Sequence, residues 1–61
     1  MTREEELAEA RDWLLHFNAV SRAHGLDPVP LTESNIAWTA MLNALCPTQP
    51  EEAALSQQQS S

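Results

Sequence analysis

The feature that most constrains this chain is a run of seventeen residues, 34–50, without a single charged side chain. Its first part, residues 35–46, predicts a helix that is apolar around most of its circumference. A helix of this kind must be covered on more than one side. Only one other long helix is predicted in the 61 residues, so we expect part of the cover to come from a second molecule. The sequence therefore indicates a protein that associates.

The length of the chain points the same way. Domains this small usually need disulfides, a metal ion or oligomerisation to supplement a thin core. The single cysteine, Cys46, rules out an intramolecular disulfide and fits a reducing compartment. His16, His24 and Cys46 do not have the spacing of a zinc motif, and we expect no metal or other cofactor. Oligomerisation is the remaining route to stability.

The charge of the chain argues against several functions. Nine acidic residues face three arginines and no lysine, which gives a net charge of −6. A nucleic-acid-binding surface needs a basic stripe, so we expect no direct contact with DNA or RNA. We expect no signal peptide, and no apolar run reaches membrane-spanning length. We therefore expect a cytoplasmic protein that does not bind membranes.

The first helix is predicted over residues 3–24. Thr2 and Glu5 have the spacing of a capping box at a helix start. Gly25 can take the left-handed conformation that ends a helix, with Leu26 folding back in a Schellman arrangement.

The second helix is predicted over residues 33–45. Pro28 and Pro30 make the preceding segment a stiff, non-helical connector. Thr32 is the expected N-cap, and Pro47 stops the helix. A connector this short favours an antiparallel hairpin. The hairpin would occupy residues 1–46, followed by a polar tail, 47–61, which we predict to be disordered from its composition. The alternative is one helical turn around residues 51–55 that docks on the hairpin.

The predicted fold class is all-α, with two hairpins forming a four-helix bundle as a homodimer. The first helix has an apolar stripe of the width expected for a core. On the second helix, only Asn35, Thr39 and Asn43 form a narrow polar wedge. The remaining surface would be shared between the core and the dimer interface. The residues predicted for this shared core and interface are Leu7, Ala10, Leu14, Phe17, Ile36, Trp38, Ala40, Met41, Leu42 and Leu45.

Two further surfaces are candidates for binding another protein. On the back of the first helix, Leu15 is predicted to lie among Arg11, Asn18 and Arg22, and arginine is enriched at interface hot spots. The first turns of the same helix are acidic, and their Glu5 and Glu9 could meet a basic partner. Ordinary solvent exposure is the simpler interpretation of a charged helix end.

No set of residues indicates catalysis. Asp12 and His16 are four residues apart, which suggests a surface helix contact. We therefore expect a non-enzymatic regulator or inhibitor, of the kind that phages and plasmids use, binding a host protein such as a transcription regulator. One alternative is a constitutive small subunit of a larger complex. Another is a nucleic-acid mimic, in which the carboxylates imitate phosphates. An RNA-binding hairpin bundle conflicts with the scarcity of basic residues.

Overall fold

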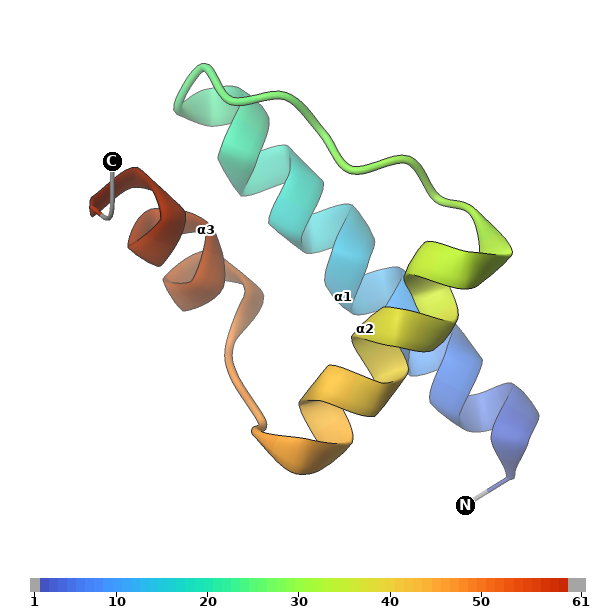
Figure 1. Cartoon of the computed structure of the whole chain (residues 1–61). Coiled ribbons are helices and arrows are strands. Elements are labelled where there is room, and N and C mark those ends of the chain that lie inside the picture. Colours follow the sequence, from blue (N-terminus) through green and yellow to red (C-terminus); the bar gives the residue numbers. More distant parts are fainter. Residues whose placement is uncertain (1, 60–61) are drawn as a thin grey trace.

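The described part of the chain, residues 2–59, folds into three helices, and the second and third both pack on the first. The computed structural model describes residues 2–59, and their side chains up to residue 56. Helix α1 spans Arg3–Ala23, α2 spans Glu33–Leu45 and α3 spans Pro50–Gln59. Within the described residues the fold is all-helical. Figure 1 shows α2 crossing the N-terminal half of α1, while α3 lies along its C-terminal half.

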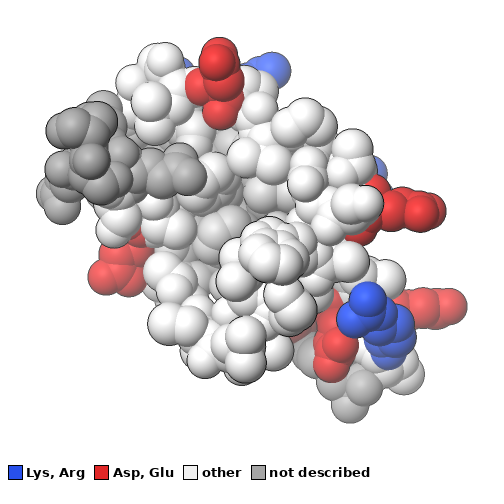
Figure 2. Space-filling model, viewed as in Figure 1, with Lys and Arg blue, Asp and Glu red and all other residues white. Residues whose placement is uncertain are grey.

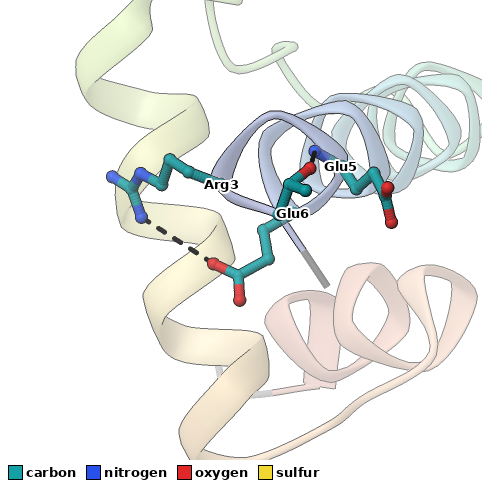
Figure 3. Close-up of polar contacts among 4 residues, drawn as sticks. Arg3, Glu5 and Glu6 are labelled. Atoms are coloured by element: carbon teal, nitrogen blue, oxygen red, sulfur yellow. Dashed lines mark hydrogen bonds and ion pairs between the residues drawn. The ribbon is translucent and has the colours of Figure 1, made fainter.

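Both ends of α1 follow from local side-chain and backbone chemistry. Thr2 is the N-cap, and its hydroxyl oxygen accepts a hydrogen bond from the backbone N–H of Glu5 at 3.2 Å. In the first turn, Nη1 of Arg3 lies 4.0 Å from Oε2 of Glu6 (Figure 3). At the other end, Gly25 has a φ of 77°. The N–H of Leu26 donates to the carbonyl of Ser21, which confirms the predicted Schellman arrangement.

The connector between α1 and α2 is held against α1 by one asparagine side chain. The Nδ2 of Asn18 donates to the carbonyl oxygen of Val29 at 2.9 Å, and its Oδ1 accepts from the Val29 N–H at 2.8 Å. The amide of Asn18 thus pairs with both backbone groups of Val29, as a neighbouring β-strand would. Pro28 and Pro30 on either side favour the extended backbone that this pairing requires.

The start of α2 lies beside the start of α1. Thr32 is the N-cap, as predicted, and its hydroxyl oxygen accepts from the Asn35 N–H at 3.1 Å. Glu33 lines a groove with Arg3 and Glu4, in the first turns of α1. The extended connector, rather than a second antiparallel helix, therefore carries the chain back along α1. In place of the predicted two-helix hairpin, the fold has a helix that crosses α1.

The segment predicted as a disordered tail contains the third helix. Pro50 occupies its first position, followed by Glu51 and Glu52 in the first turn, a pattern typical of helix starts. Helix α3 packs on α1 through Ala54, which is 2 % exposed. The predicted disorder is thus wrong for residues 50–59, and the alternative of a docked helical turn is nearer to the structure. Residues 60–61 lie outside the described part.

Two polar contacts fix the position of α3. The indole N–H of Trp13 donates to the carbonyl oxygen of Thr48 at 2.7 Å, just before α3 begins. His16 Nε2 lies 3.1 Å from a carboxylate oxygen of Glu51. The latter pair is half-exposed, and such pairs contribute little to stability.

The core lies between α1 and α3. Leu14 and Phe17 of α1 are buried against Ala54, and Phe17 stacks on Trp13 with ring centroids 5.3 Å apart. Ala10 is buried as well, which confirms its place on the predicted core stripe of α1. The partly buried side chains packed around this core include those of Trp13, Val20, Val29, Ile36 and Ala53.

Candidate functional site

Helix α2 turns a partly polar face towards α1. Thr39 is only 8 % exposed. Ile36, Ala40 and Asn43, which lie on the same side of the helix, are half-buried. Thr39 was predicted on a solvent-facing polar wedge, and this placement is wrong. The crossing with α1 is therefore made by small and medium-sized side chains.

Burying Thr39 costs little, because its hydroxyl is satisfied within α2. Its Oγ1 donates to the carbonyl oxygen of Asn35 at 2.8 Å, so no polar atom of that side chain is left without a partner. The Nδ2 of Asn35 in turn donates to the carbonyl oxygen of Pro30 at 2.8 Å. The side chains of Asn35 and Thr39 are thus bonded to the connector and to α2 itself.

The opposite face of α2 presents large apolar side chains to solvent. Trp38 is 59 % exposed and Leu45 is 78 % exposed, while Met41 and Leu42 are each 45 % exposed. Their spacing of i, i+3, i+4 and i+7 places all four on one stripe of a helix. We call this stripe the α2 apolar face. Figure 2 shows the surface over α2 as a broad region without charged residues, with Asp, Glu and Arg side chains around its edge.

The α2 apolar face is large for a chain of this size. If a fully exposed large side chain offers roughly 200 Å², the four exposed fractions leave about 450 Å² of these side chains in contact with water. The largest apolar patch on a typical monomer is about 300–600 Å² and is often functional. A molecule of 61 residues with a patch in this range carries an unusually large share of exposed apolar surface.

The residues predicted for a shared core and interface separate into two groups. Ala10, Leu14 and Phe17 are buried in the core, and Leu7, Ile36 and Ala40 are half-buried. Trp38, Met41, Leu42 and Leu45 do not contribute to the core of the single chain. Within the single chain, the residues predicted for one cluster therefore divide into a buried or half-buried group and an exposed group.

One of the four residues predicted on the back of α1 is engaged within the fold. Arg11, Leu15 and Arg22 are exposed, as expected. Asn18 is half-buried and holds the connector through Val29, so its side chain is not available to a partner. Leu15 is 46 % exposed, which for an isolated leucine needs no functional explanation.

Arg11 also belongs to an open groove between the first turns of α1 and α2. Its floor is apolar and its rim carries two arginines and two glutamates. The lining residues are Arg3, Glu4, Leu7, Ala8, Arg11, Glu33, Ile36 and Ala37. The balanced charges of this rim do not select a ligand of either sign. Glu5 and Glu9 are exposed on the same half of α1.

The structure also shows which signals the sequence reasoning missed. The core contact of Ala54 and the hydrogen bond from Trp13 both depend on α3, whose start could have been recognised from proline followed by two glutamates. No comparable pattern in the sequence indicates that Trp38 points outward. Residues 2–59 contain no group of three His, Cys, Asp or Glu side chains placed to hold a metal ion. None of the described helices is long and apolar enough to cross a membrane.

Comparison with known proteins adds no relative: no family model matches the chain, and neither the curated proteins nor the solved structures give a significant match.

Proposed function

We propose that this chain is a small acidic protein–protein interaction module that regulates or inhibits a partner protein through the α2 apolar face. The observation that carries the proposal is the exposure of four large apolar side chains on one stripe, with Leu45 78 % exposed. Tryptophan and methionine are enriched in protein interfaces, and tryptophan is among the commonest hot-spot residues. An amphipathic helix that offers anchors at this spacing matches the helix-in-groove mode of recognition.

The distribution of charge supports the same proposal. Interfaces combine an uncharged centre with a polar rim, and the surface over α2 lacks charged residues while its edge carries them (Figure 2). The net charge of −6 favours a partner with a basic surface beside its apolar groove, because complementary charges speed association and select orientation. Glu5 and Glu9, both exposed on α1, are our candidates for this acidic contribution.

A matched pair of leucine variants tests the proposal. Leu45→Glu places a charge in the α2 apolar face, whereas Leu55→Glu changes a leucine on α3 that is 41 % exposed and outside the face. The chain and both variants would be immobilised, and proteins from an extract of the source cells would be captured and quantified. We expect a partner to bind the unchanged chain and Leu55→Glu but not Leu45→Glu. Identical sets of captured proteins for all three would contradict the proposal.

A further inference from the structure

We propose that the first occupant of the α2 apolar face is a second copy of this chain, with the two α2 helices packed antiparallel about a two-fold axis. The inference rests on the proposed function, because it assigns a partner to the same face. Three properties of the face favour a second copy: its pattern along the helix, the distribution of charge and the area available.

The pattern of the face reads the same in both directions along the helix. Positions 38, 41, 42 and 45 are separated by three, one and three residues. A two-fold axis between positions 41 and 42 therefore places Trp38 of each copy against Leu45 of the other, so this contact occurs twice. Met41 and Leu42 each meet their own counterpart beside the axis. Such repetition of every contact is what an isologous interface requires.

The charges of the chain favour contact through α2. Two copies that each carry a net charge of −6 repel each other, and residues 34–50 form the long stretch without any charge. The charged residue of α2 is Glu33, in its first turn. In an antiparallel pair the two Glu33 residues lie about 25 Å apart at a rise of 1.5 Å per residue, well beyond the screening length of about 10 Å. A parallel pair would bring them together.

The area of the face is sufficient for a reversible dimer. Two copies of the face remove about 900 Å² of these side chains from water. Stable interfaces bury about 1,200–2,000 Å², and smaller ones are transient. We therefore expect a dimer that dissociates in the micromolar range or above. Its centre would contain α2 of each copy with α1 outside, which makes a four-helix arrangement.

The oligomeric state of three proteins tests the inference. Sedimentation equilibrium of the chain, Leu45→Glu and Leu55→Glu would be measured from about 1 μM to about 1 mM, a range that brackets weak interfaces. We expect a monomer–dimer equilibrium. Leu45→Glu should raise the dissociation constant of the dimer at least about tenfold, because it removes a hot-spot contact that occurs twice. Leu55→Glu should leave the dissociation constant unchanged. Circular dichroism would check that helicity is retained. A monomer at all concentrations, or equal effects of the two variants, would overturn the inference.

Disulfide cross-linking tests the antiparallel arrangement. Met41→Cys and Leu45→Cys would each be made with Cys46→Ser and oxidised at a concentration where the chain is dimeric. In the proposed pair, residue 41 adjoins its counterpart, whereas the two residues at 45 are displaced by about 10 Å along the helices, too far for a disulfide. We expect a covalent dimer only from Met41→Cys. A covalent dimer from Leu45→Cys would overturn the arrangement.

These results also separate the two proposals. A chain that stays monomeric but loses its captured partner in Leu45→Glu would refute the dimer and retain the interaction module. A dimer broken by Leu45→Glu, with the same proteins captured by all variants, would support the second copy as occupant and refute regulation of another protein through this face.

Discussion

Replacing Asn18 by alanine tests how the connector is held against α1. The substitution removes two hydrogen bonds, of 2.9 Å and 2.8 Å, to the carbonyl and N–H of Val29. Each contributes about 1 kcal/mol, and partly buried groups left without partners raise the cost. Alanine recovers roughly 0.5 kcal/mol through its higher helix propensity. We expect the free energy of unfolding to fall by about 2 kcal/mol.

This loss is large for such a small protein. Stabilities of about 0.05–0.15 kcal/mol per residue correspond to roughly 3–9 kcal/mol for the whole chain. A loss of 1 kcal/mol shifts the Tm of a domain of this size by about 4–8 °C, so Asn18→Ala should lower it by about 10 °C. Urea unfolding followed by circular dichroism, together with a thermal scan at low protein concentration, would measure both quantities.

Two further variants make the result specific. Asn43→Ala makes the same change of side chain at a half-buried position of α2, away from the connector. It should lower the free energy of unfolding by well under 1 kcal/mol, because no side-chain hydrogen bond among the described residues is lost there. Asn18→Asp keeps an acceptor for the Val29 N–H but loses the Nδ2 donor, so its effect should fall between the two. If Asn18→Ala were no more destabilising than Asn43→Ala, the side-chain pairing with Val29 would not hold the connector.

Three other substitutions probe the ends and the core of the fold, each measured by chemical unfolding. Trp13→Phe loses the hydrogen bond to the Thr48 carbonyl and should destabilise the chain by about 1–2 kcal/mol; an unchanged stability would mean that this bond does not anchor α3. Ala54→Asp puts a charge at a site only 2 % exposed, so α3 should detach with loss of helical signal, a result that retained helicity would contradict. Gly25→Ala has open space for its methyl group, but the backbone φ at this position is +77°. The free energy of unfolding should therefore fall by about 1 kcal/mol from backbone strain alone. A more stable variant would contradict this reason.

The ends of the first two helices could be predicted from sequence because they depend on neighbouring residues. Thr2, Gly25 and Thr32 act through contacts within five residues, so a local pattern contains all the information. The same holds for the core stripe of α1, where Ala10, Leu14 and Phe17 are buried as their helical spacing predicts.

The orientation of α2 could not be predicted in this way. A helical wheel ranks faces by hydrophobicity, which places Trp38 inside and Thr39 outside. In the structure the order is reversed, because the connector brings α2 across α1 and Thr39 satisfies its hydroxyl on Asn35. Helix α3 was missed for a related reason. The average composition of residues 47–61 is polar, yet Ala53 and Ala54 bring an apolar contact to the core, and such a short contact does not alter the average.

The central position of α1 has a consequence for how the molecule opens. In the described residues α2 and α3 each pack on α1 and not on one another, so α3 can leave without breaking the crossing with α2. Amide hydrogen exchange should therefore reveal two cooperative units of different protection, with α3 exchanging first. Its departure uncovers Leu14 and Phe17, which Ala54 covers in the closed state. We therefore expect an opening of α3 to add a second exposed apolar surface, formed by Leu14 and Phe17, to the α2 apolar face.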